Sequence, residues 1–414
     1  MAFLRSKPRE VFTPRASSFN PKMYIDRSVL EASLKKHLNG TRHVVVHGES
    51  GNGKTWLYKK VLSDLKMPYL VVNLANASRL GSLQEAFKDK VKKESPGETL
   101  SQKVVNRTTE ANAVVLKQDY TDQKVYDVVE REPLEALMAL LRREAGRKRA
   151  VIVLDNFEQI LASEKLIKEL SDSIVLLDDE DYASFDIRFC IVGVPVDIRD
   201  YLSKQSSIET ISNRLVELPE VARLSDEEAS LLLERGFREI LKYDVTDDDV
   251  SQIVWKTDRI AQHLHEFGLE VSEILESASS RNVTSEILEQ AAVEWCSSSL
   301  SAVKNTIDHN LNARDTRAGR RNQVIYSLGC IKTEDFKYTD VEDTVRDEFK
   351  DSTDGVILNV AQTLSQLEKS EFPLIKRVPK GDAYRMINPK IKIAIGTMLQ
   401  KDGDGKATKI PALT

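Results

Sequence analysis

A glycine-rich octapeptide that follows an apolar run constrains this chain more than any other feature of its sequence. The apolar run is His43-Val-Val-Val-His47, and the octapeptide Gly48-Glu-Ser-Gly-Asn-Gly-Lys-Thr55 comes directly after it. Glycines allow a backbone to wrap an anion with its N–H groups, and the dipole of a helix that begins there favours negative charge. The spacing is that of the Walker A phosphate loop, which needs a strand before it and a helix after it. We therefore predict a nucleotide-phosphate site on a strand–loop–helix unit.

The loop also predicts the cofactors and most of the residues that bind them. In a site of this type a lysine reaches the β- and γ-phosphates and the hydroxyl that follows it ligates Mg²⁺. Lys54 and Thr55 stand at these two positions, so we expect ATP and Mg²⁺ as cofactors. The predicted nucleotide-binding residues of the loop and the following turn are Gly48, Glu49, Ser50, Gly51, Asn52, Gly53, Lys54, Thr55 and Trp56.

A second apolar run, Ala150-Val-Ile-Val-Leu, ends at Asp155 and matches a Walker B strand. Such a strand places a carboxylate beside the metal, so Asp155 is the second predicted Mg²⁺ ligand. The next residue is Asn156, where many P-loop ATPases carry the glutamate that activates the attacking water. We expect Glu158 to take that role where the strand gives way to a loop. Slow hydrolysis, in a protein that acts as a nucleotide-gated switch, is the alternative.

Short apolar runs alternate with amphipathic stretches through the first half of the chain. The apolar runs predict strands at 43–47, 69–74, 150–154 and 187–192. The amphipathic stretches predict helices at 28–38, 54–65, 133–146, 158–170 and 225–241. Continuous apolar strands between helices indicate a parallel sheet that is covered on both faces. The predicted fold class is α/β, a P-loop NTPase sheet followed by a helical lid domain and a C-terminal winged helix-turn-helix.

The length of 414 residues suits two or three domains, and the sequence pattern indicates three domains with two tails. The predicted parts are a basic flexible tail (1–22), a P-loop domain (23–222) with an insertion at about 95–130, a helical lid (223–315), a winged helix (316–402) and a flexible tail (403–414). The basic tail either stays solvated or contacts a phosphate backbone or an acidic partner. The insertion is either a partner-binding segment or a decorated loop.

Two arginines outside the loop are candidates for contact with nucleotide. Arg214, in Ser-Asn-Arg-Leu, is a candidate arginine finger that acts on a neighbouring subunit's nucleotide, and a surface salt bridge is the alternative. Arg259, in the lid, is a further candidate. The run that ends at Gly193-Val-Pro195 offers no Asn or Thr as a γ-phosphate sensor, so a sensor there is absent or comes from the backbone.

The last part of the chain predicts three helices, at 320–330, 338–349 and 356–369, and a hairpin of strands at 374–378 and 383–387. This order is typical of a winged helix-turn-helix. The third helix carries a polar stripe suited to base edges or phosphates, made of Asn359, Gln362, Thr363 and Gln366. Basic residues suited to a phosphate backbone follow, namely Lys376, Arg377, Lys380, Arg385, Lys390 and Lys392, with Asp382 as the only acid from 372 to 392. Acids between 334 and 348 favour the alternative, a protein-binding or autoinhibitory module.

Composition excludes several other classes of protein. The net charge of −5 excludes a chain that is basic throughout. No apolar run approaches the roughly 20 residues that span a bilayer, and the first residues lack the apolar segment of a secretory signal. We therefore expect a cytoplasmic protein without a membrane partner. Three widely spaced cysteines, Cys190, Cys296 and Cys330, fit neither a disulfide framework nor a paired-cysteine zinc site.

Together these features resemble AAA+ ATPases of the initiator or origin-recognition branch, bordering on the STAND signalling ATPases. The resemblance covers roughly residues 23–400 and includes Tyr24-Ile-Asp-Arg27 before the first helix, both Walker motifs, Arg214, the lid and the winged helix. It implies that the segment from Tyr24 to Arg27 packs near the adenine and that nucleotide lies between the α/β and lid domains. It also implies a homo-oligomer in which an arginine completes a neighbour's site.

We therefore expect an ATPase whose nucleotide state controls oligomerisation and the engagement of double-stranded DNA through the winged helix. The alternative is a signalling or scaffold protein that holds ATP without cycling and recruits an effector protein, for example in a bacterial defence or mobile-element system. Asn156 favours the alternative.

Overall fold

The computed structural model describes residues 6–16, 18–95, 103–105, 127–129, 131–194, 211–299, 301–312, 319–331, 333–378, 381–388, 390–403 and 405–410. The chain divides into two compact units. Unit 1 comprises Met1–Ala16, Asn20–Ile25 and Arg223–Thr414, and unit 2 comprises Ser17–Phe19 and Asp26–Ala222.

Unit 2 is built on a five-stranded sheet with the strand order β2-β5-β6-β1-β7. Its strands are β1 (His43–His47), β2 (Tyr69–Asn73), β5 (Ala150–Asp155), β6 (Ile187–Val194) and β7 (Leu215–Glu217). All neighbouring strands pair in parallel. The four apolar runs predicted as strands are therefore confirmed, and β7 is a fifth strand that the sequence did not indicate.

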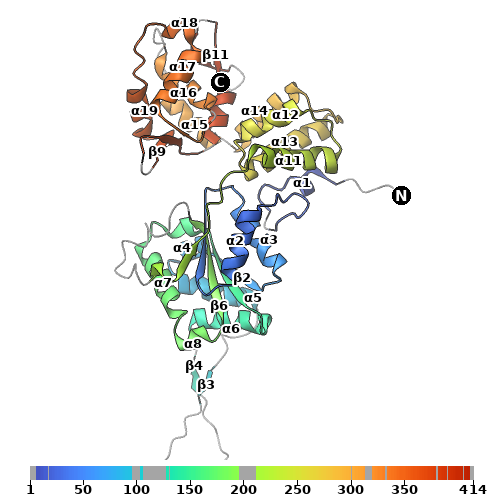
Figure 1. Cartoon of the computed structure of the whole chain (residues 1–414), viewed down its shortest axis with the longest axis vertical. Helices are drawn as coiled ribbons and strands as arrows, with labels where there is room; N and C mark the ends of the chain where they lie inside the picture. The colour runs from blue at the N-terminus through green and yellow to red at the C-terminus, as the bar shows by residue number, and fades with distance from the viewer. Residues whose placement is uncertain are drawn as a thin grey trace, which may run out of the picture. The chain divides into compact units, whose positions relative to one another are not determined.

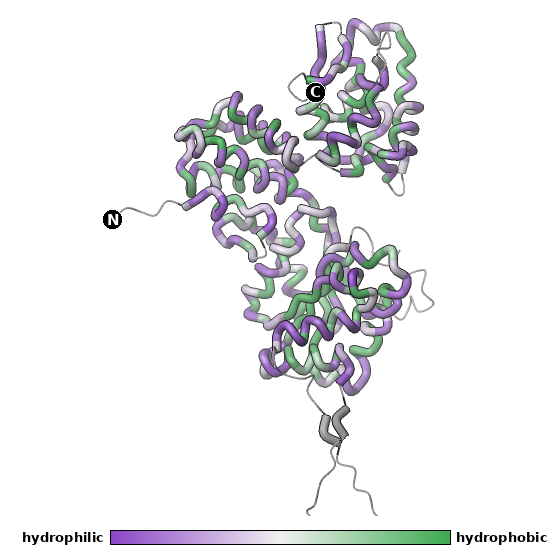
Figure 2. Tube along the Cα trace, turned by 180° about the vertical axis from the view of Figure 1, so that it is seen from behind, coloured by the Kyte–Doolittle hydropathy of each residue, from purple (hydrophilic) through white to green (hydrophobic). Residues whose placement is uncertain are grey.

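Helices cover both faces of this sheet (Figure 1). On one face α2 (Ser28–Leu38) and α3 (Lys54–Asp64) pack on Val44, Val151 and Cys190. On the other face α4 (Leu74–Leu80), α5 (Leu83–Glu94), α6 (Pro133–Ala145) and α7 (Glu164–Leu176) pack on Val45 and Ile152. Neighbouring residues of one strand thus belong to different cores, because side chains alternate along a strand. This explains why the strands are largely apolar (Figure 2).

The chain after β5 differs from the sequence prediction. We expect one helix at 158–170, but the chain forms a short 3₁₀ helix, η1 (Phe157–Ile160), before α7 begins. The Ser163 side chain accepts a hydrogen bond from the Leu166 N–H and so caps α7 at its start. A short helix, α8 (Glu180–Ala183), follows α7. In the predicted insertion β3 (Lys103–Val105) pairs antiparallel with β4 (Asp127–Val129), and most of the rest lies outside the described residues.

The first half of unit 1 is helical, as the sequence predicts. Its elements are α11 (Asp226–Glu234), the π-helix η2 (Arg235–Leu241), α12 (Asp247–Thr257), α13 (Ala261–Ser277), α14 (Ser285–Ser299) and α15 (Ser301–Asn310). The helix α11 begins with the expected capping box, in which the Ser225 N–H donates to Glu228 and the Glu228 N–H donates to the Ser225 hydroxyl.

The second half of unit 1 contains the predicted three helices and hairpin. They are α16 (Arg320–Cys330), α17 (Tyr338–Glu348), α19 (Val360–Glu368), β9 (Ile375–Arg377) and β10 (Tyr384–Met386). The additional elements are β8 (Asp335–Phe336), α18 (Lys350–Thr353), α20 (Lys390–Met398), β11 (Leu399–Lys401) and β12 (Ala407–Lys409). The antiparallel sheet has the order β8-β10-β9. The prediction of a flexible tail from residue 403 is wrong for β12, which pairs with β11 and buries Ala407.

The N-terminal segment is also ordered, against the prediction of a flexible tail. It forms α1 (Pro8–Val11), and the ring of Phe12 is completely buried. A Cβ on Gly236 would lie 2.4 Å from an atom of this ring, and a Cβ on Gly268 would lie 2.6 Å from one. The ring therefore fits a notch that exists because η2 and α13 carry glycine at these positions. The next residue, Thr13, donates its N–H to Nδ1 of His265 at 3.1 Å. The sequence did not show this because two apolar residues are too few to form a pattern.

Among the residues that the structure describes, no helix has both the length and the hydropathy needed to cross a membrane.

Replacing Phe12 with Ala tests whether this segment stabilises unit 1. Loss of a fully buried phenyl ring is expected to lower the free energy of unfolding by about 3–5 kcal/mol. Urea unfolding followed by intrinsic tryptophan fluorescence, to which the buried Trp295 of the same unit contributes, measures the change. Leu231→Ala is the control, since that side chain is 41% exposed and its loss is expected to change stability by less than about 0.5 kcal/mol. A change for Phe12→Ala as small as that of the control would contradict the account.

Candidate nucleotide-binding site

The octapeptide forms the predicted loop between β1 and α3. Gly48, Gly51 and Gly53 have φ angles of 139°, 88° and 91°, which side-chain-bearing residues rarely adopt. The helix α3 begins at Lys54, directly after Gly53 in a left-handed conformation. The strand–loop–helix context that the motif requires is therefore confirmed.

The loop is packed against the backbone of Val221. A Cβ on Gly48 would lie 2.5 Å from the carbonyl oxygen of Val221, so no larger residue fits there. The same carbonyl accepts a hydrogen bond from the Asn52 side-chain amide at 3.1 Å. The Val221 N–H in turn donates to the His47 carbonyl at 3.0 Å. The side chain of Asn52 is thus buried against the protein backbone, and its role is to shape the loop.

Lys54 lies at the centre of the charged groups of the site. Its Nζ donates hydrogen bonds to the carbonyl oxygens of Gly48 and Glu49, both at 2.8 Å. Burial lowers the pKa of Lys54, and the charges of Glu158, Asp155 and Glu49 act in the opposite direction. The fold therefore brings together Lys54, Asp155 and Glu158, three residues that the sequence analysis selected.

The carboxylate of Asp155 lies at the end of β5 and accepts two hydrogen bonds. Its Oδ2 accepts from the Tyr58 hydroxyl at 3.1 Å, and its Oδ1 accepts from the Asn156 N–H at 2.9 Å. Asn156 has a positive φ of 63°, and its side-chain amide donates to Asn73 Oδ1 at 3.0 Å. Asn73 is the residue of β2 opposite Asp155. The side chain after the Walker B aspartate is therefore bound to the neighbouring strand.

Glu158 lies in η1 and is packed against β6. A Cβ on Gly193 would lie 2.2 Å from Oε2 of Glu158, so the carboxylate occupies space that exists because residue 193 is glycine. The β1–β6 register shifts at this point, between Val46 and His47. Burial raises the pKa of Glu158, and Lys54 opposes this shift. At Gly193, where the sequence offers no Asn or Thr as a γ-phosphate sensor, the carboxylate of Glu158 lies against the backbone.

Two residues of this site were missed by sequence reasoning, namely Tyr58 and Asn73. Tyr58 is four residues after Lys54 on α3, so helix spacing alone indicates a neighbour of the lysine. Nothing in the sequence shows that its hydroxyl contacts Asp155. Asn73 ends an apolar strand, as Asp155 does, which is the one local signal that it lies at the same edge of the sheet.

The remaining predicted nucleotide contacts are distributed over both units. In unit 2, Arg27 donates from NH1 to the Ala222 carbonyl at 2.8 Å. Arg214 lies at the start of β7, at the edge of the sheet opposite the phosphate loop, and its Nε is 2.6 Å from Asp178 Oδ2. In unit 1, Tyr24 is buried and Arg259 lies 3.8 Å from Asp226. The salt bridge of Arg214 is thus present, and the roles of these residues toward nucleotide stay predictions.

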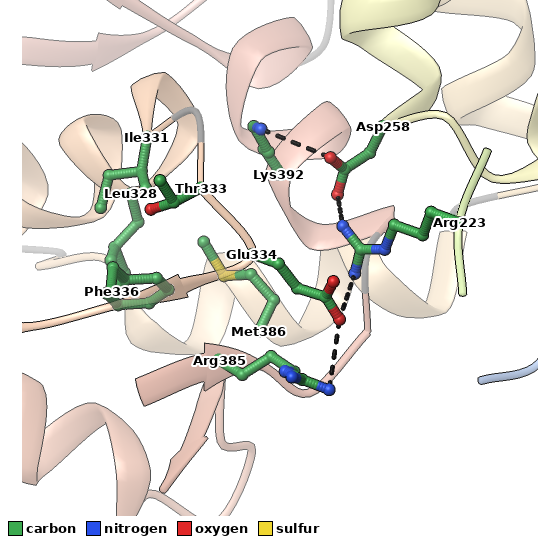
Figure 3. Close-up of a pocket in the computed structure, with 10 residues that line it drawn as sticks. All are labelled: Arg223, Asp258, Leu328, Ile331, Thr333, Glu334, Phe336, Arg385, Met386 and Lys392. Atoms are coloured by element: carbon green, nitrogen blue, oxygen red, sulfur yellow. Dashed lines mark hydrogen bonds and ion pairs between the residues drawn. The ribbon is translucent and has the colours of Figure 1, made fainter. Parts of the chain in front are cut away.

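A second group of charges lies in unit 1, around a small pocket between α12, α16, α20 and the hairpin (Figure 3). Arg223 is 2.5 Å from Asp258 and 3.4 Å from Glu334. Asp258 also pairs with Lys392 at 3.6 Å, and Glu334 pairs with Arg385 at 3.2 Å. Burial lowers the pKa of Lys392, opposed by Asp258. These ion pairs join the helical part of unit 1 to its C-terminal part.

The predicted basic surface is therefore smaller than the sequence indicates. Lys392 is paired with Asp258, as described above. Arg385 pairs with Asp335 as well as with Glu334, and Arg377 pairs with Glu368 at 3.2 Å. Lys390 lies 3.0 Å from the buried Glu266. Counting along residues 372–392 missed these acids because they come from other elements. Lys376 is exposed, and Lys380 lies outside the described residues.

The predicted polar stripe lies only partly on a helix. Asn359 precedes α19, with a φ of 51°, and is exposed, as are Gln362 and Gln366. Thr363 is half-buried. The side-chain oxygen of Gln366 accepts a hydrogen bond from Arg321 at 3.1 Å.

Comparison with known proteins identifies the fold. A family model described as an AAA domain matches residues 37–202. The structure is similar to the Walker-type ATPase PABY2304 of Pyrococcus abyssi, with a TM-score of 0.51 and 15% identity over 93% of this chain and 99% of that chain. It is also similar to the ADP form of the Aeropyrum pernix ORC2 protein, with a TM-score of 0.52 and 14% identity over 94% and 96% of the two chains. A comparison with curated proteins finds no match. The chain thus has the P-loop AAA+ fold, and its residues 37–202 are similar to an AAA domain.

Proposed function

We propose that this protein is an ATP- and Mg²⁺-dependent AAA+ ATPase whose nucleotide state controls oligomerisation and the engagement of double-stranded DNA through a C-terminal winged helix. We further propose that it is cytoplasmic. The observation that carries the proposal is the convergence of Lys54, Asp155 and Glu158 beside a well-formed phosphate loop. The similar Aeropyrum pernix ORC2 protein was solved in an ADP form, which supports nucleotide as the ligand.

The residues at the loop fit a magnesium ion. Thr55 and Asp155 offer hydroxyl and carboxylate oxygens, the ligand type that Mg²⁺ prefers. Among the described residues there is no group of three or more His, Cys, Asp or Glu side chains that could hold a metal by themselves. This suits Mg²⁺, which is usually held by one or two protein oxygens together with substrate phosphates. When bound, it neutralises charge on those phosphates.

Three side chains of the protein then have separate roles in hydrolysis. Lys54 exchanges its two carbonyl partners for phosphate oxygens, which are stronger acceptors because they are charged. Glu158 accepts the proton of the attacking water, a task for which a carboxylate with a raised pKa is suited. Arg214 completes the site of a neighbouring subunit after it leaves Asp178.

A second candidate function is an ATP-bound switch that hydrolyses slowly and recruits an effector protein. The observation that favours it is the Asn156 side chain, which is bound to Asn73. A second observation also favours it, because Arg385, Lys390 and Lys392 are paired with acids of unit 1. These cations are then less available to a phosphate backbone.

Replacing Glu158 with Gln tests the proposed hydrolysis. The amide keeps the shape of the side chain but cannot take a proton, so steady-state turnover of ATP is expected to fall by about 10²–10⁴-fold while ATP binding is retained. Lys54→Ala is the control and should lose both binding and turnover. If Glu158→Gln turns over ATP as fast as the wild type, the role of Glu158 is contradicted. If Lys54→Ala still binds ATP, the phosphate-loop assignment is overturned. A wild type that binds ATP without turnover would favour the switch.

Two matched variants test the proposed engagement of DNA. Lys376→Gln removes an exposed charge and is expected to weaken binding to a labelled duplex and to reduce its salt dependence by about one unit of slope. Arg385→Gln removes a charge that Glu334 and Asp335 already neutralise, so the slope should stay as in the wild type. Fluorescence anisotropy over a range of salt concentrations measures both. Duplex binding that is absent, or insensitive to salt, would sink the DNA proposal.

A further inference from the structure

We propose that Tyr58 is a positioning residue that fixes the carboxylate of Asp155 in the orientation in which it receives Mg²⁺ with the nucleotide. This inference rests on the proposed function, because it assigns a role within the same site. It adds a residue from the phosphate-loop helix to the support of the Walker B aspartate.

The geometry places the Tyr58 hydroxyl on one oxygen of the carboxylate and a backbone donor on the other. The Tyr58 O–H donates to Oδ2 at 3.1 Å, and the Asn156 N–H donates to Oδ1 at 2.9 Å. A carboxylate has about four lone-pair sites, so each oxygen keeps capacity for a metal-bound water or a metal. Two donors on different oxygens fix the rotation of the group, which a single donor does not.

The phenol can act only as a donor toward an ionised carboxylate, because the carboxylate has no proton to give. Its ring is 1% exposed and lies in the core between α3 and the sheet. Burial raises the pKa of Tyr58 above its ordinary range, and Asp155 acts in the same direction. The buried hydroxyl therefore has the Asp155 carboxylate as its acceptor within this core.

The position of Tyr58 on α3 links two parts of the site that lie far apart in the sequence. The residue follows Lys54 by one helical turn, and α3 begins at the end of the phosphate loop. A hydrogen bond from α3 to the end of β5 therefore ties the orientation of Asp155 to the placement of the loop. The phenyl ring alone would fill the core equally well, so packing does not account for the hydroxyl.

Removing the hydroxyl tests the proposal through metal binding, without reliance on turnover. Mg²⁺ is titrated into wild type and Tyr58→Phe in the presence of a fluorescent ATP analogue, and analogue affinity is also measured in EDTA. Loss of an outer partner of a metal ligand is expected to weaken the apparent Mg²⁺ affinity by about 10-fold. Affinity for the analogue in EDTA is expected to match the wild type, because Lys54 and the loop are unchanged.

Tyr69→Phe is the matched control. Its ring stands edge-on to that of Tyr58, with centroids 6.5 Å apart, and it lies on β2 in the same core. Removing its hydroxyl should leave the Mg²⁺ dependence unchanged. Tyr58→Met, which also lacks a donor but packs differently, should show the same loss as Tyr58→Phe, so the test does not depend on one variant folding well.

The outcomes separate this inference from the proposed function. An Mg²⁺ response of Tyr58→Phe equal to that of the wild type would overturn the positioning role alone. Equal losses with and without Mg²⁺ would overturn it too, since they would show that Tyr58 only packs. A wild type that binds the analogue with no Mg²⁺ response would overturn the proposed function, and the inference with it.

Discussion

The shape of the phosphate loop is constrained by its contact with the backbone of Val221. Val221 lies so close to Gly48 that a Cβ there would stand 2.5 Å from its carbonyl oxygen, and the same oxygen binds the Asn52 amide. The helix α3 begins directly after this loop, at Lys54, and carries Tyr58 one turn later. The backbone that shapes the loop continues within two residues into Arg223, where the chain enters unit 1.

Electrostatics at this edge of the sheet favour a ligand that brings both phosphate and a cation. Lys54 is surrounded by the charges of Glu158, Asp155 and Glu49, and it is bound to neutral carbonyl oxygens. Carboxylates that lie close together repel one another, and a divalent cation relieves that repulsion. Phosphate groups offer the lysine stronger acceptors than carbonyls. The proposed ligand, ATP with Mg²⁺, would satisfy both demands, whereas either one alone would leave some of the charges unmatched.

Sequence reasoning succeeded where structure is decided locally and failed where distant segments meet. The Walker loop and the strands β1, β2, β5 and β6 were predictable because glycine spacing and continuous apolar runs are local signals. The burial of Phe12 was not, since the notch that receives it is formed by glycines more than 200 residues away. The charge of the C-terminal region was overestimated because Asp258 and Glu334, which pair with Lys392 and Arg385, lie on other elements. The contact between Tyr58 and Asp155 likewise depends on how α3 packs on the sheet.

The most direct test of this account is a crystal structure of the chain with a non-hydrolysable ATP analogue and Mg²⁺. The account predicts that Lys54 Nζ leaves the carbonyl oxygens of Gly48 and Glu49 and binds phosphate oxygens. It also predicts Mg²⁺ beside Thr55 and Asp155, with Glu158 still packed on Gly193 and facing the γ-phosphate. A nucleotide bound elsewhere, or Lys54 still bound to the loop carbonyls with the analogue present, would contradict it.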